Sequence, residues 1–298
     1  NRRIFDYDLS RYAANAGAEI YTKSFVKDVI IEDDFVKGVK LDYLGEPREI
    51  RSNIVIAADG LASHVGNAAG LRTLVKIKDM ESGLQYSVSN VDVPINKMIM
   101  YVGSNHAPGG YLWIFPKGDR FANIGIGIDG KSSKLRSAKS YLDEFMENNF
   151  PDAAILTTKC GGIPCPSPMK SPIKNGLMLV GDAARLINPV TGGGIAPAMK
   201  SGMISGQIAA EAIKNNDYSE KFLTRYTKRV FKEFGNNHER LYRIKEAIHK
   251  LNDDELNSIA DKVSAIDPSK RSLGSVFKAA VYKKPSLILD VVRIFAGF

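Results

Sequence analysis

Residues 176–202 read GLMLVGDAARLINPVTGGGIAPAMKSG, and this stretch decides the expected fold. An apolar run ends at Gly181-Asp182, and three consecutive glycines at 192–194 precede a helical pattern. A carboxylate at a strand end can accept hydrogen bonds from ligand hydroxyls, while the free N–H groups of a helix start attract an anion or an electron-rich ring edge. The stretch therefore predicts a strand, loop and helix wrapped around a large flat or anionic ligand. A plain glycine-rich loop with a capped helix is the alternative.

The composition is that of a globular chain with a basic surface. The sequence has 298 residues, 44% hydrophobic and 25% charged, with a net charge of +8. Such a charge favours anionic partners without choosing among them. The two cysteines and four widely spaced histidines show no zinc spacing, so we expect no metal site and no disulfide framework. No apolar run reaches the length needed to span a bilayer.

The periodicity along the chain predicts an α/β layer that is interrupted by an antiparallel sheet and then resumed. A helix is expected from residue 4, closed by Gly17 and followed by a short strand at 18–22, and strands are expected at 25–31, 35–44 and 48–59. The end of the last run, NIVIAADG, is typical of a parallel strand covered on both faces. Alternating segments at 84–128 predict the antiparallel sheet. A helix at about 134–149, a connection at 160–175 and mostly helical structure from about 198 complete the pattern.

One motif is misleading. Gly125-Ile-Gly127-Ile-Asp-Gly130 matches the dinucleotide fingerprint G-x-G-x-x-G, which requires a strand that turns directly into a helix. Here the glycines lie inside an alternating strand, so we interpret them as places where a bulky ligand approaches the sheet closely. A second strand-end acid, Asp59-Gly60, is equally consistent with a capped turn.

Four segments together resemble the FAD-dependent geranylgeranyl reductase family, within the p-hydroxybenzoate-hydroxylase-like flavoproteins. They cover most of the chain and read RRIFDYDLSRYAANAGAEI, VIAADGLASHVGNAAGL, GGYLWIFPKGDRFANIGIGI and LMLVGDAARLINPVTGGGIAPAM. The resemblance implies an FAD-binding fold with an inserted antiparallel β substrate domain and a helical C-terminus. The implied divisions are 1–75 and 176–215 for the FAD-binding domain, 76–175 for the substrate domain and 216–298 for the helical region.

The same resemblance implies roles for individual residues. Arg2 would contact the phosphate or adenosine side of FAD, Val26 the adenine region through its backbone, and Asp182 the ribityl or pyrophosphate portion. Residues at the start of the helix would offer backbone N–H groups to the flavin ring edge. The cofactor-binding set is Arg2, Val26, Asp59, Asp182, Gly193, Gly194 and Ile195.

Parts of the family pattern have no counterpart after Asn1. These are the FAD fingerprint with the first βα unit, the Glu that holds the adenosine ribose, and a Cys-containing loop near the flavin. We therefore expect the sequence to be about the last three quarters of such an enzyme, because this fold needs a first strand and a Gly-rich turn. By itself such a chain is expected to bind FAD poorly.

The implied reaction is saturation of isoprenoid C=C bonds in geranylgeranyl chains of archaeal glycerophospholipids. An isolated alkene has no carbonyl to polarise, so we expect positioning and exclusion of water, rather than an acid–base constellation, to provide most of the rate. No catalytic residue is assigned. Candidate walls of an apolar substrate tunnel are Tyr111, Trp113, Phe115 and Pro116, with Gly125 and Gly127 leaving room for the lipid chain. A well-packed sheet core is the alternative for each.

The C-terminal part is rich in lysine and arginine. Nine basic residues and three Glu lie between 221 and 250, interleaved with apolar Phe222, Tyr226, Phe234, Leu241 and Ile244. Such a helix either lies on anionic head groups or covers the FAD-binding domain, and the tail at 273–298 presents the same choice. Expected partners are the lipid substrate, the cytoplasmic face of the cell membrane and an electron donor (ferredoxin, a deazaflavin or NAD(P)H), and not nucleic acid. A flavin-dependent aromatic monooxygenase and a non-catalytic lipid-binding fragment are the competing functions.

Overall fold

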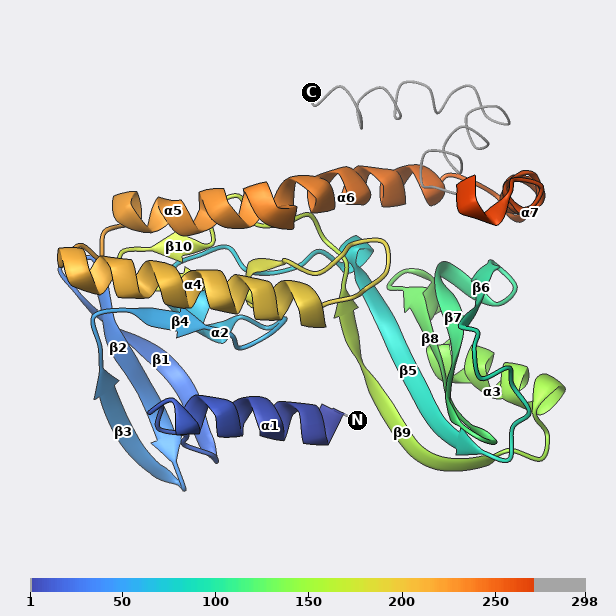
Figure 1. Ribbon diagram of the computed structural model, residues 1–298, viewed down its shortest axis with the longest axis horizontal. Helices are drawn as coiled ribbons and strands as arrows, with labels where there is room; N and C mark the ends of the chain where they lie inside the picture. Colours follow the sequence, from blue (N-terminus) through green and yellow to red (C-terminus); the bar gives the residue numbers. More distant parts are fainter. Residues whose placement is uncertain (1, 271–298) are drawn as a thin grey trace.

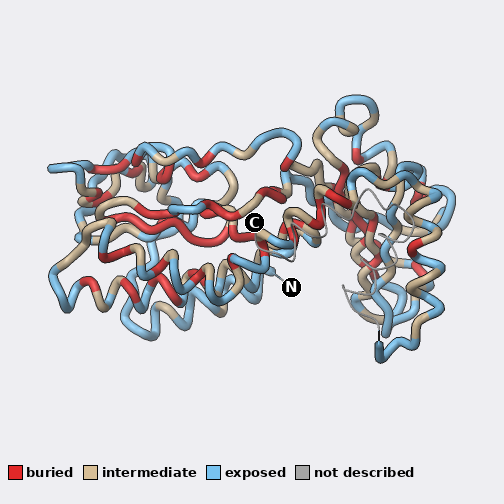
Figure 2. The backbone as a smooth tube through the Cα atoms, turned by 90° about the horizontal axis from the view of Figure 1, so that it is seen from above, coloured by how far each residue is buried: buried red, intermediate tan, exposed pale blue. Residues whose placement is uncertain are grey.

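The computed structural model describes residues 2–270 and forms two lobes joined by the C-terminal helices (Figures 1 and 2). The first lobe is built on a small mixed sheet of order β10–β11–β4. Strand β11 (Leu177–Leu179) pairs in parallel with β4 (Val55–Ala57) and antiparallel with β10 (Ile173–Lys174). The expected buried strand at GLML is therefore confirmed, and all three β11 side chains have no exposed surface.

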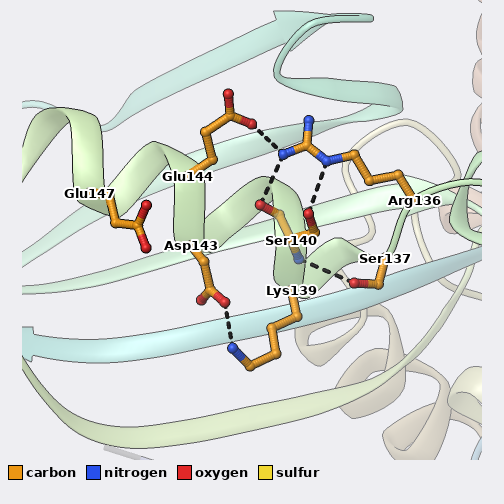
Figure 3. Close-up of a pocket in the computed structure, with 7 residues that line it drawn as sticks. All are labelled: Arg136, Ser137, Lys139, Ser140, Asp143, Glu144 and Glu147. Carbon is orange, nitrogen blue, oxygen red and sulfur yellow. Dashed lines mark hydrogen bonds and ion pairs between the residues drawn. The ribbon is translucent and has the colours of Figure 1, made fainter.

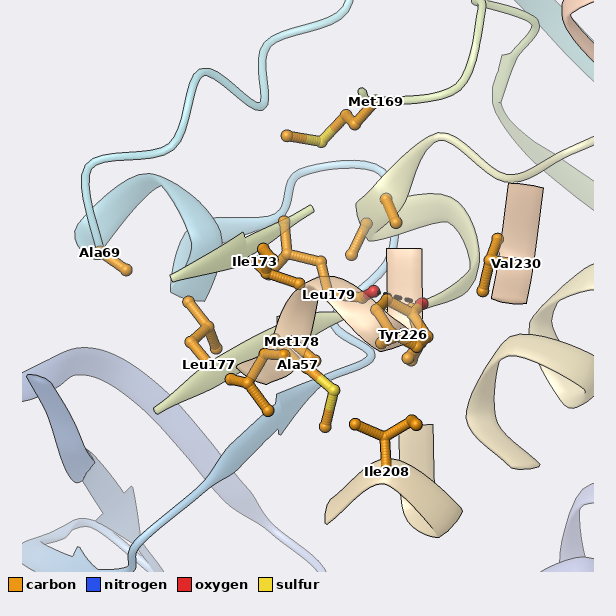
Figure 4. Close-up of a cluster of buried hydrophobic side chains, with 14 of the residues drawn as sticks. Ala57, Ala69, Met169, Ile173, Leu177, Met178, Leu179, Ile208, Tyr226 and Val230 are labelled. Carbon is orange, nitrogen blue, oxygen red and sulfur yellow. Dashed lines mark hydrogen bonds between the residues drawn. The ribbon is translucent and has the colours of Figure 1, made fainter. Parts of the chain in front are cut away.

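Two helices cover this sheet. Helix α4 (Ile195–Asn215) follows the three glycines, as expected, and packs against α5 (Glu220–Val230). The Tyr226 hydroxyl, on α5, donates a 2.7 Å hydrogen bond to the Leu179 carbonyl in the middle of the core (Figure 4). Because a buried phenol without a partner would be costly, this bond fixes how α5 lies on β11.

The N-terminal segment differs partly from expectation. Helix α1 (Arg2–Asn15) forms and ends before Gly17, which has a φ of +96°. The strand predicted at 18–22 is wrong, because the first ladder begins only at Ser24, opposite Tyr43. Strands β1 (Ser24–Glu32), β2 (Phe35–Tyr43) and β3 (Glu46–Arg51) form an antiparallel sheet of their own.

The run predicted as one strand at 48–59 is divided between β3 and β4. Strand β4 has only three residues, and Ile56 in its centre is 39% exposed. The expected parallel pairing is confirmed with β11, but the described residues leave the Ile56 face of β4 partly open. The short helix α2 (His64–Ala68) follows.

The second lobe is a five-stranded antiparallel sheet of order β6–β7–β8–β5–β9, with helix α3 (Ala138–Asn149) on one face. Its strands are β5 (Met80–Ser89), β6 (Ile99–Gly103), β7 (Ala107–Gly118), β8 (Phe121–Asp129) and β9 (Ala154–Pro164). Leu84, Tyr86 and Val88 alternate toward α3 and form its core with residues of β7 and β8. Gly125 and Gly127 of the misleading motif lie within β8, as expected, and Gly130 directly follows it. Strand β9 occupies the start of the predicted connection at 160–175.

The C-terminal helices run along both lobes. Helix α5 continues through a π-helical turn (Phe231–Gly235) into α6 (Asn236–Ile248), and α7 (Asp253–Ser264) follows. The apolar residues seen in the sequence face the protein: Phe222, Tyr226, Leu241 and Ile244 are at most 8% exposed. This favours the covering role of the helix over a membrane-bound apolar face. The tail at 273–298 lies outside the described residues, and the domain divisions at 75, 175 and 215 stay predictions.

Short 3₁₀ turns connect these elements: Ile77–Asp79 before β5, Ser132–Lys134 before α3, Gly181–Ala184 after β11 and Pro268–Lys270 at the end. None of the helices between residues 2 and 270 is long and apolar enough to cross a membrane.

Candidate functional site

Asp182 lies where β11 turns toward α4. The turn places Gly181 at a φ of +56°, and the Gly181 N–H donates to the Ser201 hydroxyl at 3.0 Å. A Cβ added to Gly194 would lie 3.0 Å from Asp182 Oδ1, so the carboxylate and the start of α4 face each other closely. Desolvation by burial raises the pKa of Asp182.

Asn188 shapes the glycine loop in front of α4. Its side-chain oxygen accepts hydrogen bonds from the N–H groups of Val190 and Thr191 at 3.0 and 3.2 Å. Its backbone pairs with the Gly193 carbonyl and with the N–H of Gly192, whose φ is +65°. Since α4 is 21 residues long, its first N–H groups carry the positive end of a full helix dipole. The exposed loop can therefore receive an anion or the acceptor edge of a flat ring.

Tyr111 connects this loop to the antiparallel sheet. Its hydroxyl donates a 2.5 Å hydrogen bond to the Thr191 carbonyl, across 80 positions of sequence. The Tyr111 and Trp113 ring centroids are 5.6 Å apart, and Phe115 stacks on Trp113 at 6.1 Å. Trp113 Nε1 donates to Gln85 Oε1 at 3.2 Å, which fixes the indole on the sheet face opposite α3. The structure thus brings the aromatic row and the glycine loop together.

The two glycines of β8 make room for protein side chains rather than for open space. A Cβ on Gly125 would lie 2.6 Å from Trp113 Cε2, and one on Gly127 would lie 2.7 Å from Glu81 Oε2. The expectation that these glycines leave room for a ligand chain was therefore wrong in its detail. Pro116 was also misplaced, because it pairs with Ala122 on the α3 side, and successive strand residues alternate between faces.

The remaining predicted residues, Asp59, Arg2 and Val26, lie on or next to three different elements. Asp59 follows β4 at the same sheet edge as Asp182, and its Oδ2 accepts a 2.9 Å hydrogen bond from the Val65 N–H at the start of α2. Arg2 forms an ion pair with Asp6 within α1. Val26 lies on β1 next to a bulge between Val26 and Asp28. Their predicted contacts with a cofactor stay predictions.

Comparison with known proteins identifies the family. The family model described as "Geranylgeranyl reductase catalytic domain" matches residues 79–163, which coincide with the antiparallel lobe. Over 293 residues the chain is 42% identical to digeranylgeranylglycerophospholipid reductase 1 of Methanococcoides burtonii, covering 98% of this chain and 72% of that protein. It is 41% identical to the digeranylgeranylglycerophospholipid reductase of Methanosarcina acetivorans, over 99% of this chain and 73% of that one. The chain belongs to the geranylgeranyl reductase family.

Solved structures agree with this assignment. A geranylgeranyl bacteriochlorophyll reductase-like protein from Thermoplasma acidophilum superposes with a TM-score of 0.91 at 39% identity, over 98% of this chain and 74% of that one. A flavin-dependent brominase superposes with a TM-score of 0.65 at 16% identity, over 95% and 75%, which shows a shared fold alone. The geranylgeranyl reductase chain therefore has a mixed α/β fold with an antiparallel sheet and C-terminal helices.

Sequence reasoning missed Glu81 and Cys165 in this geranylgeranyl reductase. Strand β5 was expected from Leu84 but begins at Met80, so Glu81 was left outside the alternation that places it on the Trp113 face. A longer alternation, continued back through Gly83, would have found it. Cys165 is buried immediately after β9, beside Glu81.

A hollow of about 420 Å³ lies on the outer side of α3 and is unrelated to the predicted site (Figure 3). Its lining is charged and internally paired, with Arg136 bound to Glu144 and Lys139 to Asp143. None of the predicted site residues lines it.

Proposed function

We propose that this chain is a flavin-dependent reductase that saturates the isoprenoid C=C bonds of geranylgeranylated archaeal glycerophospholipids. The observation that carries the proposal is the Tyr111–Thr191 hydrogen bond, which brings the aromatic sheet face to the glycine loop. The relatives named digeranylgeranylglycerophospholipid reductase supply the substrate class. In this proposal the first lobe belongs to a p-hydroxybenzoate-hydroxylase-like FAD-binding fold, and the antiparallel lobe is its inserted substrate domain.

The residues of the loop fit FAD. The half-buried Asp182 carboxylate faces Gly194, where a side chain would crowd the carboxylate. Asp182 would accept hydrogen bonds from the ribityl hydroxyls, and Gly194 and Ile195 would offer N–H groups to the ring edge. The Gly193 N–H donates to the Thr191 hydroxyl at 3.2 Å and so keeps the loop in shape for this contact. Arg2, Val26 and Asp59 are proposed for the adenosine and phosphate side. When bound and reduced, FAD supplies the hydride for the reduction.

The chain's own residues would position the alkene and exclude water. Tyr111, Trp113 and Phe115 offer a continuous aromatic surface, and the bond from Trp113 to Gln85 keeps the indole in one orientation. An isoprenoid chain held flat on this surface loses translational freedom before reaction, which is how positioning accelerates a step that offers little charge to stabilise.

The chain would bind its lipid substrate at the membrane surface. Lys221, Arg225 and Lys228 of α5 are exposed to solvent, while the apolar residues of the same helix are buried. A basic outer face attracts anionic head groups without inserting into the bilayer. We propose that the chain is peripheral to the inner face of the cell membrane, and that ferredoxin, a deazaflavin or NAD(P)H reduces it.

The test is a flavin titration followed by a lipid assay. FAD is titrated into the chain, and into the chain with a relative's N-terminal segment joined to residue 1, and flavin fluorescence is recorded. The flavin-loaded protein is then reduced under anaerobic conditions and incubated with digeranylgeranylglycerophospholipid. The masses of the products are measured by mass spectrometry. Gain of hydrogens across the alkenes supports the proposal. Flavin binding with NAD(P)H-driven oxygen consumption and no saturation would indicate a monooxygenase, and absence of flavin binding by both proteins would indicate a lipid-binding module.

A further inference from the structure

Glu81 lies where the antiparallel sheet meets the glycine loop. It is on the face of β5 that also carries Gln85, the partner of Trp113. A Cβ on Gly127 would lie 2.7 Å from Glu81 Oε2 and 3.7 Å from Ile163 Cδ1. Ile163 also reaches the loop, since its Cγ2 would lie 3.0 Å from a Cβ on Gly192. The Glu81 carboxyl and the glycine loop therefore share a neighbour.

Besides Lys245, three other titratable groups surround Glu81, and two of them are hydrogen-bonded elsewhere. The Asp129 carboxylate accepts hydrogen bonds from the Lys131 N–H, the Ser132 N–H and the Ser132 hydroxyl. The Tyr111 hydroxyl donates to Thr191, and burial raises its pKa to about 12. Cys165 is buried directly after β9, its thiol is hydrogen-bonded to the Glu81 carboxyl, and desolvation raises the pKa of that thiol.

The charged groups around Glu81 have opposite effects on its pKa. Lys245, on α6, attracts a negative charge at Glu81, but its Nζ already donates to the Cys165 carbonyl at 2.6 Å and pairs with Asp79 at 3.3 Å. Asp129 repels that charge. Burial is the largest influence, and the pKa of Glu81 is raised as a result. Glu81 is thus a carboxyl that can hold a proton beside the aromatic face.

We propose that Glu81 is the acid that protonates the alkene during reduction, an inference that rests on the proposed function. The O–H bond of Glu81 breaks, and its proton forms a C–H bond with one alkene carbon using the π electron pair. The hydride supplied by the reduced cofactor forms the C–H bond at the other carbon. Glu81 is left as a carboxylate, which Lys245 attracts, and it recovers a proton from solvent before the next turnover.

Glu81→Gln tests the proposal because it keeps the shape and removes the acid. We expect single-turnover lipid reduction to slow by about 10²- to 10⁴-fold, the usual contribution of a general acid. The wild-type rate should fall as the pH rises through the raised pKa of Glu81, and Glu81→Gln should lack this limb. Flavin content and substrate binding should be unchanged.

A paired substitution moves the carboxyl without deleting it. In Gly127→Ala the new Cβ would displace the Glu81 carboxyl, so the rate should fall and the pH limb should shift. Gly161→Ala is the matched control on the same sheet face, because its Cβ would meet nothing within 4 Å and the rate should stay at the wild-type value.

Infrared difference spectra of the protein without flavin provide a readout independent of activity. Above the ordinary Glu pKa of about 4.3, a protonated-carboxyl band should persist in the wild type, disappear as the pH is raised further, and be missing in Glu81→Gln. If the wild type saturates the lipid but Glu81→Gln keeps its rate and pH profile, Glu81 is not the acid and the proposed function stands. If the wild type does not saturate the lipid at all, both proposals fail.

Discussion

Asp182 shows how a residue proposed for ligand binding lowers stability. Burial raises its pKa because the low-polarity surroundings disfavour the carboxylate. Between its unfolded and folded pKa values the folded protein therefore binds more protons than the unfolded chain, and stability is lost as the pH rises through that window. A residue kept in such a position is better explained by ligand binding than by folding.

Asp182→Asn removes this penalty and should also remove affinity for flavin. We expect its melting temperature to rise relative to the wild type as the pH goes from about 4 to about 7, starting from no difference below the ordinary Asp pKa of about 3.9. Loss of a charge-assisted hydrogen bond should weaken FAD binding by about 10- to 100-fold. Differential scanning fluorimetry and a flavin titration measure the two effects.

The control is Asp217→Asn, for which the sign reverses. Hydrogen bonds from the side chain and the backbone N–H of Ser219 lower the pKa of Asp217. Its substitution should therefore cost stability above the ordinary Asp pKa and none well below it. Equal pH profiles for the two variants would contradict the argument for Asp182.

At the scale of the strand, Trp113 of β7 can lie closely on β8 because residue 125 is a glycine and has no side chain. Gly125→Ala would place a Cβ 2.6 Å from Trp113 Cε2, with Cζ2 of the same ring nearer still, and 2.8 Å from the Leu84 carbonyl oxygen, so both the indole and the backbone must move. We expect a loss of about 1–3 kcal/mol, as for overpacked cores. Trp113 is the single tryptophan of the chain, so its fluorescence reports the displacement directly.

Gly161→Ala is again the reference for this strand substitution, and it should change unfolding free energy by no more than about 0.5 kcal/mol. A Gly125→Ala variant with wild-type stability and an unshifted emission spectrum would show that the indole does not lie on β8.

The junction between β7 and the glycine loop depends on a single hydroxyl. Tyr111→Phe keeps the ring and removes the 2.5 Å hydrogen bond to Thr191. A bond of this kind contributes about 0.5–1.5 kcal/mol, so amide hydrogen exchange at 190–194 should accelerate by about 2- to 13-fold. FAD affinity should fall with it, while the exchange of β8 stays unchanged. Unchanged exchange in the loop would mean that the hydroxyl does not hold it in place.

Sequence patterns predicted these elements where a local signal existed. The apolar run of β11, the glycines before α4 and the aromatic alternation at 111–115 each carry their own periodicity, and each was placed correctly. The side chains over Gly125 and Gly127 come from a neighbouring residue of β7 and from β5, and strand register is not written in either strand alone. Glu81 could not be found from the sequence for the same reason, because its position beside Gly127 depends on the pairing of β5 with β8.

At the scale of the whole molecule, a buried ion pair ties the C-terminal helices to the antiparallel lobe. Lys245 on α6 and Asp79 before β5 are 166 positions apart, and their side chains are 6% and 8% exposed. The Tyr242 hydroxyl donates to the same Asp79 oxygen at 2.9 Å. The basic pattern at 221–250 suggested a surface role for every lysine in it, since no sequence signal distinguishes the one that is buried.

Lys245→Met should be the most destabilising of these substitutions, because it leaves the Asp79 carboxylate buried without its cation. Removing one partner of a buried pair costs about 3–5 kcal/mol, measured by urea unfolding. Adding Asp79→Asn should restore most of the loss, because the neutral amide needs no counter-charge and can still accept the Tyr242 hydrogen bond. The neighbouring pair Lys78–Glu246 joins the same two segments, but its side chains are 46% and 40% exposed, so Lys78→Met should cost at most about 1 kcal/mol. If the buried and exposed lysines cost the same, or the double variant is no better than Lys245→Met, the lobes are held together by the apolar contacts of α6 and not by this pair.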